Sequence, residues 1–407
     1  MTLQYVVLFL LGYLIKEPKE PKQAWGYVPV RSNASMFWWL YYADNPTQNF
    51  TKLPLIMWLQ GGPGASGCGY GNFEEIGPLD VELKPRRTTW LQAASVLFVD
   101  NPVGTGYSYV NDTLAYATDL CTVTSDMMVV LREFFKSKTE FQQIPFYIFS
   151  ESYGGKMAAA IALELHKSLL DDKGLKEVTT AAKKILDAMN KKEFKLATLL
   201  WSKAEDIIEE NTNGVNFYNI LTQETTSKVA VASPGSEIFP FLKLFQRHVQ
   251  YQNKDKLSDL MNGAIRKKLK IIPDHVKWGG QSQNVFMNMA EDFMKHAIDI
   301  VDDLLEANVN VTVYNGQLDL INCLSFLLIH LGQEAWLRKL KWPKLKKFSA
   351  QKWQALYTSP ESSETAAFHK SYDNLDFFWI LKAGHMVPAD QGDMALKMVR
   401  IVTHQKH

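Results

Sequence analysis

Short apolar runs alternate with a helical pattern along the first 160 residues of the chain. Residues 36–43, 53–60, 95–100 and 145–150 are apolar runs of strand length. Continuous runs of this length are typical of buried strands. Residues 119–136, between the last two runs, follow a helical pattern. This order of strand, helix and strand predicts a mostly parallel sheet with helices on its faces.

Helical periodicity takes over after residue 156. Residues 156–170 (KMAAAIALELHKSLL) predict one helix, and residues 176–210 are rich in Ala, Lys, Glu and Leu. We find no strand candidate between them, so we interpret residues 171–299 as a helical insertion, or cap, between core segments 17–170 and 300–407.

The core pattern resumes in the last hundred residues. Helical signals return at 286–307, and strand candidates follow at 309–315 (VNVTVYN) and 375–381 (LDFFWIL). We therefore expect one large α/β core that is interrupted by the insertion.

The N-terminus predicts export from the cytosol. Residues 5–15 (YVVLFLLGYLI) are about as long as the apolar part of a signal peptide and too short to span a bilayer, so we assign residues 1–16 as a signal peptide. Four Asn-x-Ser/Thr sequons predict glycosylation at Asn33, Asn49, Asn111 and Asn310. Both features favour a secreted or lysosomal protein without a stable membrane anchor, although only three cysteines are present.

Composition narrows the range of partners. The 407 residues are 46% apolar and carry a net charge of +1, which gives no reason to expect nucleic acid. No Cys or His cluster has the spacing of a zinc site, so we expect no metal and no cofactor. The sequence leaves the oligomeric state open.

The segment 145–155 (PFYIFSESYGG) has the pattern of a nucleophile elbow. A buried strand runs into Ser152, and a helix follows at once. The positions two before and two after the serine, Ser150 and Gly154, are small, as a sharp turn requires. An ordinary serine in a strand-to-helix turn would show the same pattern, so this segment alone leaves the role of Ser152 open.

A serine nucleophile needs a base and a group that orients the base. His385 lies just after the apolar run 375–381, and Asp319 follows the run 309–315. Taken singly, each also fits an ordinary loop or capping role. Together the three fall in the chain order Ser, Asp, His, which is typical of α/β-hydrolases.

Six ordered segments then resemble the serine carboxypeptidase family. The segments are 58–64 (WLQGGPG), 72–78 (NFEEIGP), 99–109 (VDNPVGTGYSY), 151–155 (ESYGG), 315–319 (NGQLD) and 384–391 (GHMVPADQ). The resemblance implies an α/β-hydrolase fold and a carboxypeptidase that cleaves peptide or protein C-termini.

The resemblance also implies a role for each matching residue. Ser152, Asp319 and His385 would form the catalytic triad, and the backbone N–H groups of Gly62 and Tyr153 would form the oxyanion hole. Gln60, Gly61, Glu75 and Glu151 match the positions that bind the free carboxylate of the substrate. Two glutamates can bind a carboxylate only if at least one is protonated, so we expect an acidic pH optimum.

The chain departs from the family pattern at two places. Gln60 replaces the more common Asn. The family also has a core strand after the nucleophile helix, and this chain has no candidate for it. We expect either that the strand 145–150 lacks a neighbour, or that 309–315 moves beside it and separates Asp319 from His385.

Three functional hypotheses follow. The first is a serine carboxypeptidase that forms an acyl-enzyme and works at acidic pH. The second is an esterase or acyltransferase with the same triad. The third is a non-catalytic hydrolase-like protein, an isoform without a core strand.

Overall fold

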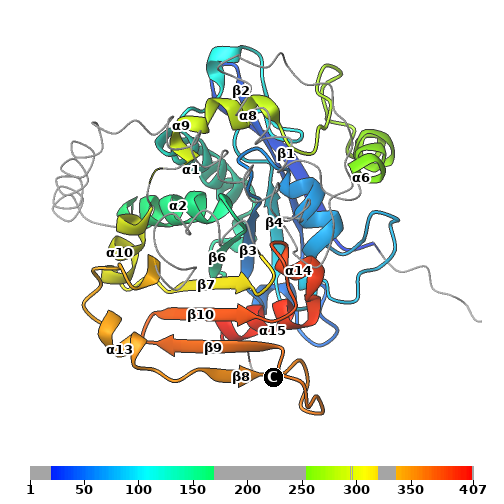
Figure 1. Cartoon of the computed structure of the whole chain (residues 1–407). Coiled ribbons are helices and arrows are strands. Elements are labelled where there is room, and N and C mark those ends of the chain that lie inside the picture. Colours follow the sequence, from blue (N-terminus) through cyan, green and yellow to red (C-terminus); the bar gives the residue numbers. More distant parts are fainter. Residues whose placement is uncertain (1–19, 169–253, 294, 296, 320–335, 406–407) are drawn as a thin grey trace, which may run out of the picture.

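A computed structural model of the chain describes residues 20–168, 254–293, 295, 297–319 and 336–405 (Figure 1). The predicted signal peptide at 1–16, the helical run at 176–210 and Cys323 lie outside the described residues.

A first sheet contains the N-terminal strands. Its order is β1-β2-β4-β3-β6, and β5 pairs with β2. The inner strands β3 and β4 are parallel to each other, β6 is parallel to β3, and β1 and β2 add antiparallel pairs at the other end. The bounds are β1 (Gln23–Arg31), β2 (Ala34–Tyr41), β3 (Leu55–Leu59), β4 (Ser95–Val99), β5 (Tyr109–Val110) and β6 (Phe146–Ser150).

A second sheet contains the C-terminal strands, in the order β7-β10-β9-β8. The β7 and β10 strands are parallel, whereas β9 is antiparallel to both of its neighbours. Figure 1 shows these yellow and orange strands together below the first sheet. The bounds are β7 (Val311–Gly316), β8 (Gln354–Leu356), β9 (Ala367–Tyr372) and β10 (Leu375–Ile380).

Helices connect and cover these sheets. The α1 helix begins after Asp119, whose side chain accepts a hydrogen bond from the Thr122 N–H at 2.7 Å. The α-helices are α1 (Leu120–Ser137), α2 (Gly154–Ser168), α6 (Lys254–Leu260), α7 (Arg266–Leu269), α8 (Gln283–Asn288), α9 (Ala290–Phe293), α10 (Ile298–Glu306), α13 (Leu345–Ser349), α14 (Val387–Asp390) and α15 (Gly392–Val402). The other helical turns are η1 (Phe50–Lys52), η2 (Gly67–Ile76), η3 (Trp90–Gln92), η4 (Thr113–Ala115), η5 (Thr139–Phe141) and η6 (Met261–Ile265).

Alternate residues of the inner strands enter two different cores. On β3, Ile56 and Trp58 join a cluster with η2 and α15, whereas Leu55, Met57 and Leu59 join a cluster with α1 and α2. Successive side chains of a strand point to opposite faces, so both faces of this sheet are covered. This explains why β3 and β4 are continuous apolar runs, with every residue buried.

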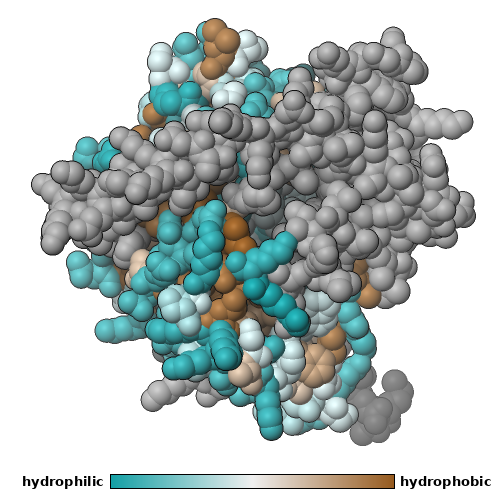
Figure 2. Space-filling view, turned by 60° about the vertical axis from the view of Figure 1, so that its left-hand side comes forward, coloured by the Kyte–Doolittle hydropathy of each residue, from teal (hydrophilic) through white to brown (hydrophobic). Residues whose placement is uncertain are grey.

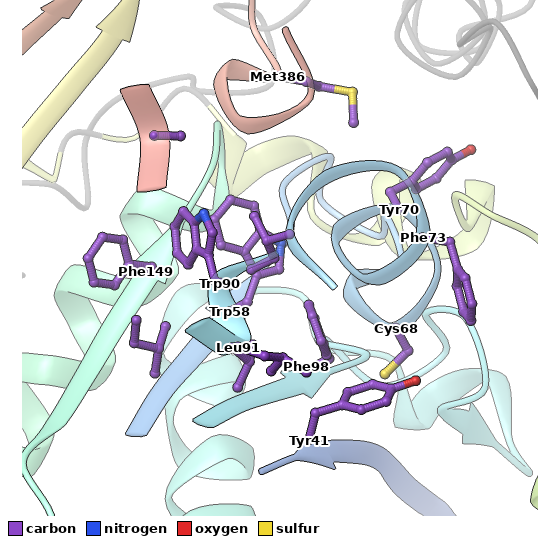
Figure 3. Packing of buried hydrophobic residues seen from close by; sticks show 14 of the residues in the cluster. Tyr41, Trp58, Cys68, Tyr70, Phe73, Trp90, Leu91, Phe98, Phe149 and Met386 are labelled. Carbon is purple, nitrogen blue, oxygen red and sulfur yellow. The ribbon is translucent and has the colours of Figure 1, made fainter. Parts of the chain in front are cut away.

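Aromatic side chains fill the first of these clusters, and Figure 3 shows that it reaches Met386, next to His385. The ring centroids of Trp58 and Trp90 lie 5.5 Å apart, and those of Trp90 and Phe149 lie 5.1 Å apart, both edge-to-face. Such pairs stabilise by about 1 kcal/mol beyond the area that they bury. The core therefore packs directly beneath the loops that carry the candidate site.

The strands predicted near 36–43, 53–60, 95–100, 145–150, 309–315 and 375–381 are confirmed. The single helical region expected at 286–307 is divided among α8, α9 and α10. Among the described strands, parallel pairing occurs in β4-β3-β6 and in β7-β10, and the remaining pairs are antiparallel, so both sheets are mixed where a mostly parallel sheet was expected.

The junction between the two sheets is the unusual feature of the fold. Within the described parts of the chain, β6 pairs only with β3, and β7 pairs only with β10. The Tyr314 hydroxyl on β7 donates a hydrogen bond to the Ser150 carbonyl oxygen, at 2.7 Å. Among the described residues, the strand at 145–150 has no second neighbour, as expected, and the alternative in which 309–315 moves beside it is wrong, because β7 keeps its place beside β10.

Polar and charged side chains cover much of the described surface, with apolar side chains between them near the middle of the face in Figure 2. No helix in the described ranges is both long and apolar enough to cross a membrane. Within the described ranges, the exposed large apolar side chains are Leu83, Leu114, Ile271, Trp353, Tyr357 and Phe368.

Candidate active site

The turn between β6 and α2 is a strained elbow. Ser152 has a φ of +57°, in the left-handed region that a non-glycine residue rarely adopts, at a cost of about 1–3 kcal/mol. It is exposed, although Glu151 and Tyr153 on either side are buried. A Cβ on Gly154 would lie 2.6 Å from the Leu59 carbonyl oxygen, so this position requires glycine. The elbow expected from the sequence is therefore present, and it presents the Ser152 hydroxyl to solvent.

His385 and Asp319 form a buried pair. The distance between His385 Nδ1 and Asp319 Oδ2 is 2.9 Å, and both side chains are almost fully buried. Burial alone would lower the pKa of His385, but the charge and hydrogen bond of Asp319, together with the charge of Glu75, raise it above its usual value. This arrangement orients the imidazole and stabilises the imidazolium that forms when His385 accepts a proton.

Main-chain hydrogen bonds extend the β7–β10 pairing to the loops that carry this pair. The Gln317 N–H donates to the Ile380 carbonyl at 2.9 Å, and the Leu318 N–H donates to the Ala383 carbonyl at 2.8 Å. A Cβ on Gly316 would lie 2.0 Å from the Gly384 carbonyl oxygen, so the two loops touch there. The second sheet therefore fixes Asp319 and His385 relative to each other.

Both residues proposed for the oxyanion hole lie next to Ser152 or to a residue that contacts it. A Cβ on Gly61 would lie 2.6 Å from Ser152 Cβ, which places the Gly61–Gly62 turn against the serine. Gly62 has a φ of +108°. Among the described residues, neither the Gly62 N–H nor the Tyr153 N–H donates to another group. Two free N–H groups next to a serine are what stabilisation of an oxyanion requires.

Gln60 connects the two glutamates that were expected to bind a carboxylate. Its Nε2 donates to Glu75 Oε1 at 2.8 Å and to Glu151 Oε1 at 3.2 Å. The Trp58 indole N–H donates to Gln60 Oε1 at 2.8 Å and fixes which end of the amide faces the acids. All three polar side chains are at most 7% exposed. The extra methylene of Gln60 therefore still lets its amide reach both glutamates.

The two glutamates favour a protonated state. Burial raises the pKa of Glu75, and the hydrogen bond from Gln60 offsets this only in part. Burial and the adjacent charge of Glu75 raise the pKa of Glu151 well above its usual value. Glu75 Oε2 and Glu151 Oε2 have no donor among the described residues. A proton on this pair can therefore be donated to an incoming carboxylate.

The side chain of Tyr153 belongs to a buried network that the sequence did not reveal. Its hydroxyl donates to Asp292 Oδ2 at 2.5 Å, and Lys156 Nζ lies 3.0 Å from the same oxygen. Phe293 stacks on the Tyr153 ring, with centroids 5.9 Å apart. Asp292 and Phe293 lie within the predicted insertion 171–299, so part of that segment supports the site. Lys156 and Asp292 are 136 residues apart, and no sequence pattern connects them.

The four predicted glycosylation sites lie at the surface. Asn33, Asn49, Asn111 and Asn310 are all exposed. Exposure is necessary for modification, which stays a prediction.

The fold and the Ser, His and Asp groups define a hydrolase of the α/β-hydrolase class, and the chain belongs to the serine carboxypeptidase family. The model of that family matches residues 14–169 and 163–405. The chain is 59% identical to the retinoid-inducible serine carboxypeptidase of Rattus norvegicus, over 98% of this chain and 96% of the relative. It is 39% identical to serine carboxypeptidase-like 51 of Arabidopsis thaliana, over 94% and 92% of the two chains.

A solved structure supports the fold. A prohormone-processing carboxypeptidase from Saccharomyces cerevisiae superposes with a TM-score of 0.69 at 20% identity, covering 94% of this chain and 91% of that chain.

The family match is interrupted where the nucleophile helix ends. Its two parts meet at residues 163–169, close to the end of α2. The alignment with the rat relative spans 440 positions, whereas 98% of this 407-residue chain is about 399 residues, so about 41 positions have no counterpart here.

Proposed function

We propose that this chain removes C-terminal residues from peptides or proteins through an acyl-enzyme, and that it works best at acidic pH. The observation that carries the proposal is the buried group of Gln60, Glu75 and Glu151 beside the Ser152 elbow. A hydrolase of esters has no need for two buried acids next to its nucleophile. A carboxypeptidase needs such a group to recognise a free carboxylate.

The triad would perform the chemistry in two steps. The Ser152 oxygen attacks the carbonyl carbon of the last peptide bond while His385 accepts the hydroxyl proton, and the N–H groups of Gly62 and Tyr153 stabilise the oxyanion. His385 then gives the proton to the leaving amine, which departs as a free amino acid. Water, activated by His385, attacks the acyl-serine and releases the shortened peptide.

Protonation links the carboxylate site to the base. Activity needs a neutral His385 and at least one protonated glutamate. The charge of Glu75 raises the pKa of His385, so a proton on the Glu75–Glu151 pair also favours the neutral imidazole. The same proton therefore prepares both the binding of substrate and the catalytic base.

The pH profile tests this proposal. Hydrolysis of an N-blocked dipeptide, relative to that of its C-terminally amidated form, should fall as the pH rises from 5 to 8, because the glutamates ionise and repel the substrate carboxylate while both substrates use the same His385. The C-terminally amidated form of the same peptide is the control, since it lacks the carboxylate. A steady rise in this ratio over the same range would contradict the proposal.

Glu75→Gln separates the carboxypeptidase from an esterase with the same triad. Because the amide introduced at this position could no longer share a proton with Glu151, peptide hydrolysis should fall about 10- to 100-fold while hydrolysis of a neutral ester is kept. Glu133→Gln, an exposed position on α1, is the matched control. Equal losses on both substrates would favour the esterase.

Labelling tests the hypothesis of a non-catalytic protein. A fluorophosphonate probe should modify Ser152, and Ser152→Ala should abolish the labelling.

We also propose that the chain acts in a secreted or lysosomal setting, supported by the apolar run 5–15 and four exposed sequons. Digestion with a glycosidase should lower the apparent mass of the protein secreted from eukaryotic cells.

A further inference from the structure

One buried carboxylate connects the first sheet to the segment that carries two parts of the site. Asp100 directly follows β4 and is 0% exposed. Its N–H donates to the Phe37 carbonyl on β2 at 3.1 Å, and its own carbonyl accepts from the Ser108 hydroxyl at 2.6 Å. The main chain at Asp100 is therefore fixed to the sheet, so its side chain is held at the carboxyl end of β4.

Three hydrogen-bond donors converge on this carboxylate. Asp100 Oδ1 accepts from the Ser66 hydroxyl at 2.6 Å and from the Cys68 N–H at 3.1 Å. Oδ2 accepts from the Tyr107 N–H at 2.8 Å. The Trp278 indole N–H donates to the Ser66 oxygen at 2.9 Å, which leaves the hydroxyl proton of Ser66 for Asp100. Each contact favours an ionised acceptor at position 100, and bonds to a charged acceptor are about twice as strong as neutral ones.

Ser66 connects this carboxylate to the loop of the oxyanion hole. It follows a turn in which the Ala65 N–H donates to the Gly61 carbonyl at 3.1 Å. A Cβ on Gly62 would lie 2.9 Å from the Ala65 nitrogen, so the turn is closely packed. Its other side lies against the nucleophile, since a Cβ on Gly61 would lie 2.6 Å from Ser152 Cβ. A shift of Ser66 would therefore move the N–H group of Gly62.

The same serine begins the helical segment that carries one of the carboxylate-binding acids. Ser66 is the N-cap of η2, and its hydroxyl oxygen accepts from the Gly69 N–H at 3.0 Å. The Cys68 N–H that bonds to Asp100 lies in the first turn of η2, where a negative charge also stabilises a helix. Glu75 is buried near the other end of η2. The position of Glu75 therefore depends on how η2 begins.

We propose that Asp100 is a positioning residue: through the start of η2, its carboxylate fixes both the oxyanion-hole turn and the acid that receives the substrate carboxylate. Asp100 acts through its neighbours and does not touch the substrate, because it has no exposed surface. The inference rests on the proposed roles of Gly62 and Glu75. A displacement of about 1 Å in a reacting group can lower the rate about 100-fold, so a residue outside the site can have a large effect.

Two variants break this connection at its two ends. Asp100→Asn keeps the shape but replaces one oxygen by an N–H donor, which must face either Ser66 or the Tyr107 N–H. Ser66→Ala removes the hydroxyl and keeps the carboxylate. Burial raises the pKa of Asp100 to about 6, although its hydrogen bonds lower it. The variants are therefore compared at pH 7, where the wild-type carboxylate is ionised.

Kinetics separate the two effects of the connection. In both variants kcat should fall about 10- to 100-fold on a neutral ester and on an N-blocked dipeptide, because both reactions use the same oxyanion hole. KM should rise on the dipeptide alone, since only the dipeptide has the carboxylate that Glu75 binds. The double variant should lose little more than the more impaired single variant, because both substitutions break one connection. Rates are given per serine labelled by the fluorophosphonate probe, so unfolded protein is not counted.

Asp126→Asn is the matched control. Asp126 on α1 is 1% exposed, and its carboxylate accepts from Arg31 on β1 at 2.6 Å, so it is also a buried carboxylate with charge-assisted bonds. This substitution should lower the melting temperature and leave kcat and KM unchanged. Equal kinetic losses in Asp126→Asn would mean that loss of any buried carboxylate has this effect, and would overturn the proposal.

Hydrogen exchange tests the positioning without any catalysis. The backbone N–H groups of residues 61–77 should exchange faster in Asp100→Asn and Ser66→Ala than in the wild type, and Asp126→Asn should not change them. Wild-type protein that is labelled but cleaves no dipeptide would contradict the proposed function, whereas slower labelling of the two variants would still support the role of Asp100.

Unchanged labelling, kcat and exchange in folded variants would overturn the inference. An equal rise in KM on the ester and on the dipeptide would overturn its second half, the link to Glu75. If Asp100→Asn does not fold, Ser66→Ala provides the same test.

Discussion

The two sheets hold their parts of the catalytic site in different ways. In the second sheet, main-chain hydrogen bonds continue from β7 and β10 into the loops that carry Asp319 and His385. In the first sheet, Ser152 follows β6, a strand with one described partner. Between the sheets, the Tyr314 hydroxyl on β7 donates a hydrogen bond to the Ser150 carbonyl oxygen at the end of β6.

This difference shows where the site is robust and where it is vulnerable. A continuous sheet fixes the spacing of its strands through many main-chain bonds, so one substitution changes little. A single side-chain contact has no such redundancy. We therefore expect the register within each sheet to survive mutation, and the register between the sheets to depend on a few side chains.

The largest expected effect is from Ser152→Ala, which removes the contribution of the first sheet to the chemistry. Loss of a triad serine typically lowers kcat by about 10⁴- to 10⁶-fold. Thermal unfolding should remain cooperative, because Ser152 is exposed and packs little. Steady-state peptide hydrolysis is the measurement, and residual activity above about 1% would assign the nucleophile to another residue.

The next effect tests the junction directly. Tyr314→Phe removes the hydrogen bond to Ser150 and keeps the ring, so kcat/KM should fall about 10- to 100-fold as the triad loosens by about 1 Å. The free energy of unfolding should fall by about 1–2 kcal/mol. Tyr372→Phe on β9, inside the second sheet, is the matched control. Equal losses in the two variants would show that the junction holds no special role.

The acidic side chains beside the two sheets also differ in how their charge is stabilised. The buried carboxylate of Asp319 is paired with His385. Glu74, on η2 beside the first sheet, differs, because burial and the charge of Glu75 raise its pKa to about 7. An acid with a raised pKa in the folded state favours folding below its unfolded pKa, near 4.5, and loses that advantage as the pH rises to about 7.

Glu74→Gln should therefore raise the free energy of unfolding at pH 8 by about 2 kcal/mol and change it little at pH 4. Urea unfolding at the two pH values is the measurement. A gain of the same size at both values would mean that packing, and not ionisation, causes the effect.

The smallest effect is expected at Tyr153. Tyr153→Phe removes the hydroxyl that binds Asp292 but keeps the stacking on Phe293 and the ion pair with Lys156. The free energy of unfolding should fall by about 1 kcal/mol and kcat by a few-fold, as the oxyanion-hole residue gains freedom. Unchanged kcat with lowered stability would limit this network to a structural role.

Much of this site could be predicted from local sequence patterns. The apolar runs at 95–100 and 145–150 predicted strands, because parallel strands that are covered on both faces have no polar face. The small residues around Ser152 predicted a tight elbow because a larger side chain at 154 would meet the Leu59 carbonyl. The β1 strand was missed because Gly26 and Pro29 interrupt its pattern and most of it is only half-buried.

The contacts between distant segments could not be predicted in this way. Gln281 lies against Gly62, and Asp292 binds Tyr153, across more than 130 residues of sequence. No periodicity or spacing rule connects such positions, because their distance depends on how the whole chain is folded. The pairing of β7 with β10 was likewise open, since the same apolar run could have filled the edge of β6.

The sequence by itself determined the local chemistry of this protein. It placed a serine at a turn that only small neighbours allow, and it carried the ordered segments of a serine carboxypeptidase. Only the tertiary structure decided that Asp319 stays 2.9 Å from His385 although β6 has a single strand partner in the described part of the chain. The physical reason is that main-chain bonds to β10 hold β7 in register, while the tyrosine hydroxyl of β7 reaches the end of β6.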